Sequence, residues 1–247
     1  MNFDTITIIA IFIAFALGGI LKGATGAGAP IITIPVIAAF YDVRIAVIIM
    51  VIPNLLTNIG QLYQFRKTIL PIFFTISFAL GGGIGAFLGT ILLVSLPIKI
   101  LTLSVAVIVI IYILLKLAVP SWKLVYEKAN KLVFIMGAGG GVLQGSAGLS
   151  APISITFLNS MKLERNQFIP TISVYFGVMS IFQMPTLYYY DFLNTDIIIL
   201  SIISTIVLMS FMPLGSWIAK SISKETFDKV TLILLGFIAL RIIYLNL

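Results

Sequence analysis

Residues 18–31 read GGILKGATGAGAPI, and residues 140–153 read GGVLQGSAGLSAPI. A shift of 122 positions aligns the two stretches, and eight of the fourteen positions are then identical. Glycine richness alone does not place the Leu, Ala, Pro and Ile of both copies in register. The sequence therefore indicates an internal duplication, with residues 1–119 as the first repeat, 120–131 as a linker and 132–247 as the second repeat.

The composition indicates that lipid surrounds most of this chain. Of the 247 residues, 60% are hydrophobic and 9% are charged, whereas a soluble domain carries about 25% charged residues. The apolar runs show no alternation of polar and apolar residues, which favours helices over a barrel. We therefore predict an all-α integral membrane protein with ten apolar elements, at roughly 5–21, 30–40, 44–65, 68–95, 98–119, 132–144, 151–160, 166–190, 196–219 and 228–246.

Two of these elements are short, and each follows one copy of the glycine-rich stretch. A membrane-spanning helix needs about 20 residues, so elements 30–40 and 151–160 are predicted to be half-helices. Each repeat then has five crossings, or three if the short element forms a re-entrant hairpin. Both numbers are odd, so the second repeat is predicted to be inverted relative to the first.

The distribution of basic residues gives an independent prediction of topology. Cytoplasmic loops of membrane proteins are rich in Lys and Arg. This rule places the N-terminus outside and the linker 120–131 in the cytoplasm of a multi-pass plasma-membrane protein. The opening segment MNFDTITIIAIFIAF lacks a basic start and is expected to remain as the first membrane segment. Three basic residues fall on the outer side, at Arg44, Lys99 and Arg241, and eleven on the inner side, at Arg66, Lys67, Lys116, Lys123, Lys128, Lys131, Lys162, Arg165, Lys220, Lys224 and Lys229.

Several chemistries are disfavoured by what the chain lacks. It has no cysteine and no histidine, so neither thiolate chemistry nor imidazole metal sites are available. No cofactor, metal or nucleic-acid partner is predicted. The carboxylates lie at the chain start or in polar interruptions, which also argues against a membrane-embedded enzyme: they are Asp4, Asp42, Glu127, Glu164, Asp191, Asp196, Glu225 and Asp228.

The repeated stretch has the features of a substrate site. Pro30 and Pro152 suit the first turn of a helix, and the start of a helix attracts anions. Lys22 is the one charged residue deep within an apolar segment, and Gln144 takes its place in the second copy. The alternatives are that the Lys22 side chain extends to the membrane–water interface and that the glycines allow close helix packing. The predicted substrate-binding set is Lys22, Gly23, Thr25, Gly26, Gly28, Pro30, Gln144, Gly145, Ser146, Gly148, Ser150 and Pro152.

Other polar residues recur at helical spacing. Asn54, Thr57, Asn58 and Gln61 form a stripe on one face of the third element, either lining a pathway or bonding helices together. The candidate pathway residues are Asn54, Asn58, Gln61, Tyr175 and Gln183. For the glycines at 81–83, 85 and 89 we expect close helix packing instead.

The motif GGILKGATGAGAPIITIPVI, its second copy GGVLQGSAGLSAP and the later PLG and GGGIGAFLG segments resemble the sulfite exporter TauE/SafE family, also called the toluenesulfonate uptake permease superfamily. The resemblance covers nearly the whole chain. It implies transport of sulfur-containing anions such as sulfite, thiosulfate or organosulfonates. Lys22 is not expected in every member of the family.

These observations predict a secondary transporter that exports a small anion by alternating access. An inside-negative potential favours outward movement of an anion, by about 2.3 kcal/mol per charge per 100 mV. No carboxylate lies within an apolar run to carry a coupling ion, which suggests uniport, unless Lys22 itself carries a proton. An anion channel with the same central site is the alternative.

Overall fold

The computed structural model describes residues 5–118, 123–221 and 224–246 and, of residues 224–228 and 246, the backbone alone. These residues form ten α-helices and a 3-10 turn at Arg66–Thr68, without strands. The predicted all-α fold is confirmed. The helices are α1 (Thr5–Thr25), α2 (Ala29–Phe40), α3 (Val43–Phe65), α4 (Ile72–Ser95), α5 (Ile98–Ala118), α6 (Tyr126–Ala147), α7 (Ser154–Ser160), α8 (Arg165–Tyr189), α9 (Thr195–Ser221) and α10 (Lys224–Asn246).

The ten predicted elements correspond to the ten helices, with boundaries that differ by up to six residues. Helices α4 and α7 begin four and three residues later than predicted, and α10 begins four residues earlier. Helix α1 continues to Thr25, beyond the predicted end at 21, because the lysine and glycine that follow are helical until the chain turns at Gly26. Helix α6 begins at Tyr126, inside the predicted linker 120–131, because the polar residues at 127–131 form its first turns. The N-terminus with Asp4, and linker residues 120–122, lie outside the described residues.

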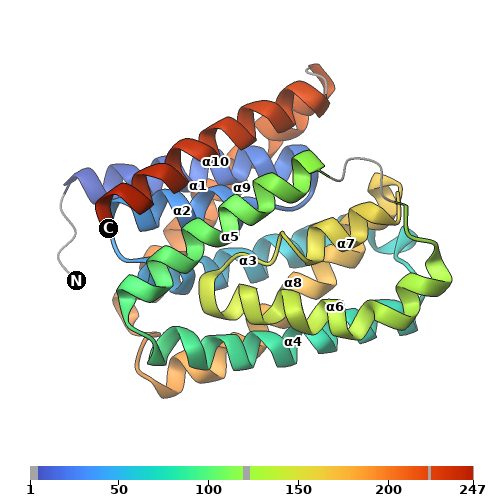
Figure 1. Ribbon diagram of the computed structural model, residues 1–247, viewed down its shortest axis with the longest axis horizontal. Coiled ribbons are helices and arrows are strands. Elements are labelled where there is room, and N and C mark those ends of the chain that lie inside the picture. Colours follow the sequence, from blue (N-terminus) through green and yellow to red (C-terminus); the bar gives the residue numbers. More distant parts are fainter. Residues whose placement is uncertain (1–4, 119–122, 222–223, 247) are drawn as a thin grey trace.

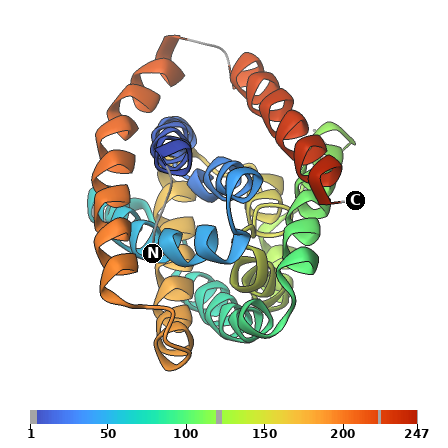
Figure 2. The ribbon, with the colours of Figure 1, turned by 90° about the vertical axis from the view of Figure 1, so that its left-hand side faces the viewer.

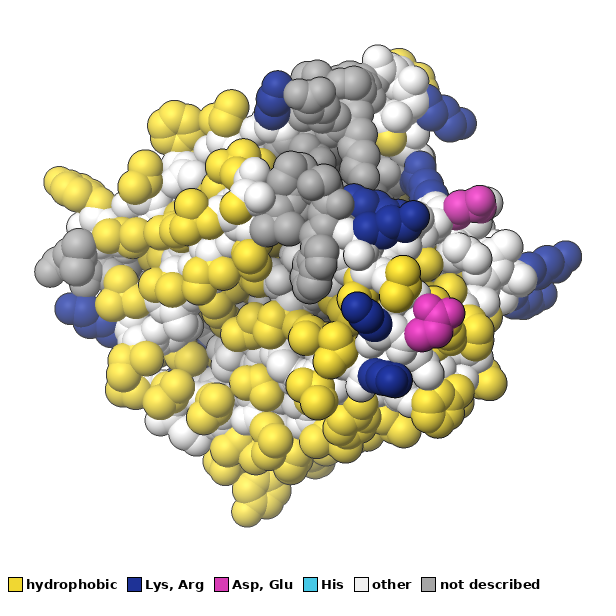
Figure 3. Space-filling model, turned by 45° about the vertical axis from the view of Figure 1, so that its right-hand side comes forward, with side chains coloured by type: hydrophobic (Ala, Val, Ile, Leu, Met, Phe, Trp, Pro, Cys, Tyr) yellow, Lys and Arg dark blue, Asp and Glu magenta, His cyan; other side chains and the backbone are white. Residues whose placement is uncertain are grey.

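The described helices have the dimensions of a multi-pass membrane protein. Six of them, α1, α3, α4, α5, α8 and α9, are long and apolar enough to cross a bilayer. Their outward side chains are apolar, as in Phe12 and Trp217, which are 51% and 64% exposed. Figure 3 shows a broad apolar surface with basic side chains gathered toward one end of the molecule. Such a surface is stable only in lipid.

The short helices lie inside the bundle. Helices α2 and α7 have 12 and 7 residues, so at about 1.5 Å per residue neither spans a hydrocarbon core of about 30 Å. Every residue of α2 from Ala29 to Ala39 is buried. Seen along the bundle in Figure 2, α1 and α2 lie inside an outer ring in which α9 stands at one edge and α5 and α10 at the other.

The two halves of the chain are interlocked by an exchange of contacts. Helix α4 of the first half packs most extensively on α6 and α8 of the second, and α9 of the second half packs on α1 and α3 of the first. The shift of 122 positions also makes α1 equivalent to α6 and α3 equivalent to α8. Helices α1 and α6 end at Thr25 and Ala147, and α3 and α8 begin at Val43 and Arg165. In Figure 1, α6 runs back toward the end of the bundle from which α1 starts.

Glycines allow these helices to touch through their backbones. A Cβ atom on Gly85 would collide with the carbonyl of Ala138 in α6, and one on Gly141 would collide with that of Gly82 in α4. Gly81 and Gly89 face α6 in the same way, while Gly83 faces Phe182 of α8. The packing role expected for the glycines at 81–83, 85 and 89 is confirmed, in the small-residue manner typical of membrane helices.

Candidate functional site

Helices α1 and α6 end in the same way, at equivalent glycines of the two copies. Gly26 has φ +81° and its N–H donates to the carbonyl of Lys22 at 2.7 Å. Gly148 has φ +71° and its N–H donates to the carbonyl of Gln144 at 2.8 Å. This left-handed cap is a conformation that glycine adopts without the penalty of a Cβ atom. The repeated glycine therefore builds the same break twice.

The copies diverge directly after the cap. In the first, Gly28 has φ +93° and α2 begins at the next residue, with Pro30 in its first turn as predicted. In the second, residues 151–153 form a turn and α7 begins only at Ser154. The prediction that Pro152 starts the second half-helix is wrong by two residues. The N–H of Ser154 and that of Ile153 both donate to the carbonyl of Ser150, which forms a turn before the helix.

Lys22 begins a buried chain of hydrogen bonds. Its side chain is 1% exposed, so the alternative in which it reaches an interface is excluded. Lys22 Nζ donates to Asn58 Oδ1 at 2.9 Å, Asn58 Nδ2 donates to Asn54 Oδ1 at 3.0 Å, and Asn54 Nδ2 donates to Ser180 Oγ at 3.2 Å. The chain connects α1 to α3 and α3 to α8, and so joins the two halves.

The charge of Lys22 has no counter-charge in the part of the chain that the structure describes. An ammonium group has three N–H donors, and the acceptor that Lys22 contacts there is one neutral amide oxygen. Burying an ion without a partner costs several kcal/mol in real proteins, to order of magnitude. This imbalance fits a site that receives an anion.

The second break offers a neutral counterpart. Gln144 is 4% exposed, and its Oε1 has no hydrogen-bond partner within the ranges that the structure describes. Ser150 is also buried, and its hydroxyl accepts from that of Ser154 at 2.9 Å. In the described residues no hydrogen bond joins these groups to Lys22.

Other predicted site residues have local partners. The hydroxyl of Thr25 donates to Leu21 O at 2.8 Å and contacts Ala27 O, and that of Ser146 donates to Val142 O at 2.8 Å. Gly23 packs on the backbone of Met212 in α9, and Gly145 packs on that of Ala86 in α4. These two glycines thus bring neighbouring helices close to the breaks.

Among the candidate pathway residues, Tyr175 stands apart from the others. Its ring stacks on Phe78 with centroids 4.0 Å apart, and its hydroxyl donates to Gly137 O at 3.0 Å. Tyr175 therefore packs among α4, α6 and α8. Asn54, Asn58, Gln61 and Gln183 are all buried polar residues of α3 and α8.

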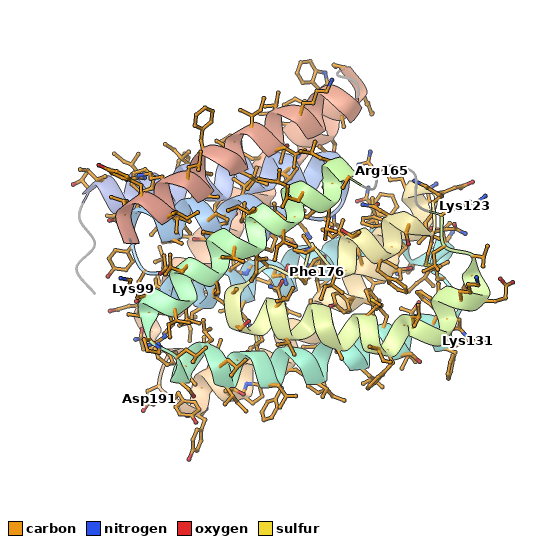
Figure 4. All side chains as sticks on the ribbon, viewed as in Figure 1. Lys99, Lys123, Lys131, Arg165, Phe176 and Asp191 are labelled. Carbon is orange, nitrogen blue, oxygen red and sulfur yellow. The ribbon has the colours of Figure 1, made fainter. Side chains whose placement is uncertain are left out.

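The two breaks lie against opposite ends of the α3–α8 pair. Gly26 faces Ile169 near the start of α8, and Gly148 faces Val47 near the start of α3. Arg44, beside Val43, donates to the carbonyl of Leu96 at 2.7 Å and so places the start of α3 at the end of the bundle where Lys99 lies. Figure 4 shows Arg165, at the start of α8, toward the other end. The hydrogen-bond chain from Lys22 to Ser180 lies between the breaks.

A pocket of about 330 Å³ opens beside the first break. Its lining includes the polar side chains of Thr25, Tyr112, Lys116, Asn159, Arg165 and Thr231. It lies toward the end of the molecule where Figure 4 places Lys123, Lys131 and Arg165, opposite Lys99 and Asp191. The grouping of basic residues predicted from the sequence agrees with this separation for the labelled residues.

Arg165 is a residue whose role the sequence analysis missed. Its Nη2 donates to the carbonyl of Gly23 at 3.0 Å, and Ser216 Oγ donates to the same oxygen at 2.9 Å. A cation at the start of a helix is unfavourable for the helix dipole. The position of Arg165 at the start of an expected helix was therefore the signal in the sequence that its side chain binds a group outside that helix.

The fold and this site define a class: a multi-pass helical membrane protein with a buried, hydrogen-bonded polar centre beside two broken helices. The model of the family described as Sulfite exporter TauE/SafE matches residues 11–242, nearly the whole chain. The chain belongs to the sulfite exporter TauE/SafE family, which confirms the resemblance and places it among membrane transporters. No curated protein and no solved structure matches it.

Proposed function

We propose that this protein exports a small sulfur-containing oxyanion, such as sulfite, thiosulfate or an organosulfonate, across the plasma membrane, and that Lys22 is its binding charge. The observation that carries the proposal is that Lys22 has no counter-charge in the part of the chain that the structure describes. It is 1% exposed and donates to one neutral oxygen, that of Asn58. Two of its three N–H groups remain for an anion, and an oxyanion has oxygens to accept both.

Alternating access by two inverted repeats is the proposed mechanism. The support is the register of 122 between helix ends and the exchanged packing of α4 and α9. In transporters built this way, one unit rocks against the other around a fixed site beside broken helices. Here α1 and α9 form one packed unit and α4 and α6 another. The hydrogen-bond chain from Lys22 to Ser180 lies where these units would move past each other.

The proposed orientation has the N-terminus outside and the basic end, with its pocket, in the cytoplasm. It follows from the Lys/Arg rule and from the position of Arg165, Lys123 and Lys131 at one end of the bundle. The pocket beside the first break would then receive the anion from the cytoplasm. The membrane potential would drive the anion outward without a coupling ion.

Binding to the purified protein is the first test. Thermal unfolding would be followed with sulfite, thiosulfate, sulfate, organosulfonates and chloride, because a ligand that binds the folded state raises Tm. We expect a sulfur oxyanion to raise Tm in the wild type and in Lys99→Ala, an exposed control, but not in Lys22→Ala. We also expect Lys22→Ala without anion to be at least as stable as wild type, because it removes an unpaired buried charge. Equal responses in the two variants would remove Lys22 from the site.

Flux measurements distinguish the transporter from the channel. In proteoliposomes a transporter moves anions at a saturable rate, and currents from single molecules are too small to resolve. Discrete single-molecule currents would support the channel. A requirement for an imposed pH gradient would contradict uniport and favour proton transfer through Lys22.

A further inference from the structure

The contact between α3 and α8, called the seam below, has buried polar side chains in addition to those in the hydrogen-bond chain of Lys22. Three of these side chains are more than nine-tenths buried: Ser173, Gln183 and Gln61 are 2%, 1% and 6% exposed. Among the described residues, Ser173 Oγ, Gln183 Nε2 and Gln61 Oε1 have no hydrogen-bond partner. A buried polar atom without a partner is unfavourable unless water or a ligand visits it.

Their positions follow from the contact between Asn54 and Ser180. Seven residues, or two helical turns, separate Asn54 from Gln61 along α3 and Ser173 from Ser180 along α8. The two helices run in opposite directions, so Gln61 and Ser173 lie on the same side of the contact, toward the basic end. Asn58, the partner of Lys22, lies between Asn54 and Gln61. Gln183 lies one turn beyond Ser180, on the other side.

The internal duplication relates these groups in pairs. The shift of 122 that aligns the breaks also places Asn58 over Ser180 and Gln61 over Gln183. Each half thus contributes a buried glutamine one turn beyond a residue of the central chain. Thr186, one turn beyond Gln183, adds a further buried hydroxyl that has no hydrogen-bond partner in the described part of the chain.

We propose that the seam holds two further binding sites for the transported anion, called stations below. Gln61 and Ser173 form one station, and Gln183 and Thr186 form the other. The two stations lie on opposite sides of the hydrogen-bond chain that begins at Lys22. Each station opens to a different face of the membrane. Amides and hydroxyls both donate and accept hydrogen bonds, so the stations suit an oxyanion that keeps part of its water shell. This inference rests on the proposed transport function and specifies its route.

Cysteine labelling provides the test, because the chain has no cysteine of its own. The probe is 2-sulfonatoethyl methanethiosulfonate, a small anionic thiol reagent that does not cross membranes. The seam variants are Ser173→Cys, which is nearly isosteric, and Gln183→Cys, with Gln61→Cys and Thr186→Cys as second variants for each station. The matched controls on α8 are Ile172→Cys, at a position that is fully buried, and Ile181→Cys, at one that is 53% exposed toward lipid.

We expect both seam cysteines to react at least about tenfold faster than both controls, because thiolates form where water reaches. Ser173→Cys should react from the cytoplasmic face, in inside-out vesicles, and Gln183→Cys from the outer face, in right-side-out vesicles. An excess of sulfate should slow both reactions. Seam cysteines that react no faster than Ile172→Cys would overturn the proposal, as would labelling of each position equally well from both faces.

Anion flux in the same vesicles separates this proposal from the transport function. Anion flux together with unreactive seam cysteines would support the transport function and show that the anion takes a route outside the seam. Sided labelling without flux of any sulfur oxyanion would support the two stations as water-filled binding sites and contradict the transport function.

Discussion

The two breaks of this protein share a backbone and differ in chemistry. Both end a helix with a left-handed glycine whose N–H bonds back to the residue four positions earlier. That earlier residue is a lysine in the first break and a glutamine in the second. The first break continues into a buried helix of 12 residues, the second into a turn and a helix of 7 residues.

The comparison of the two breaks distinguishes residues that support helix packing from residues of the proposed anion site. The shared glycines serve caps and close helix contacts, which both halves need in order to pack. Six aligned positions differ between the copies, and among them Lys22 reaches the polar centre through Asn58. A single fixed positive charge in a duplicated frame suits one anion, whereas two would repel each other across a region of low dielectric.

The largest effect is expected when the second break is given the charge of the first. Gln144→Lys would bury a second cation at a position that is 4% exposed, at a cost of several kcal/mol, to order of magnitude. We expect a marked fall in Tm without anion and a larger Tm rise with thiosulfate than in wild type. Gln144→Leu, of similar volume and without charge, is the control. A variant as stable as Gln144→Leu without anion would show that this position reaches water.

A smaller effect is expected from adding one methyl group at the equivalent glycines of each break. Gly23→Ala would collide with the backbone of Met212, and Gly145→Ala with that of Ala86. Overpacking of this kind costs about 1–3 kcal/mol, so both variants should lose thermal stability in detergent. Gly177→Ala is the control, because a Cβ there meets nothing within 4 Å. If only one of the pair were destabilised, the two contacts would not be equivalent.

The glycine and proline pattern predicted that the helices break in both repeated stretches, but not which residues meet across the breaks. The predicted ends at 21 and 144 fell four and three residues short of the ends of α1 and α6. The partner of Lys22 is Asn58, 36 residues away, and that contact depends on how α1 rotates against α3. The polar stripe from Asn54 to Gln61 was visible in the sequence, yet its link to Ser180 required the packing of α3 on α8. Pro152 misled because a turn preceded α7.

The next effect compares the two glycine caps. Gly26→Ala and Gly148→Ala each force a residue with a Cβ into the left-handed region, at about 1–2 kcal/mol, and both would press on neighbouring side chains. We expect both to lower Tm and to fray the ends of α1 and α6, measured as faster amide hydrogen exchange in the last turn of each helix. Unchanged exchange at either end would show that the cap does not hold that break.

The smallest effect is the difference in stability between Asn58→Ala and Ser180→Ala, two substitutions at equivalent positions of α3 and α8. Asn58→Ala removes the acceptor of the Lys22 ammonium, and a hydrogen bond to a charged group contributes about 1.5–3 kcal/mol. Ser180→Ala removes the acceptor of Asn54 Nδ2, a neutral bond that contributes about 0.5–1.5 kcal/mol. Both should lower Tm without anion, Ser180→Ala less. With thiosulfate present, Asn58→Ala should regain more stability than Ser180→Ala, because the anion replaces the lost partner of Lys22. If both variants regained the same stability, the anion would act away from Lys22, and the difference in chemistry between the two breaks would have no part in binding.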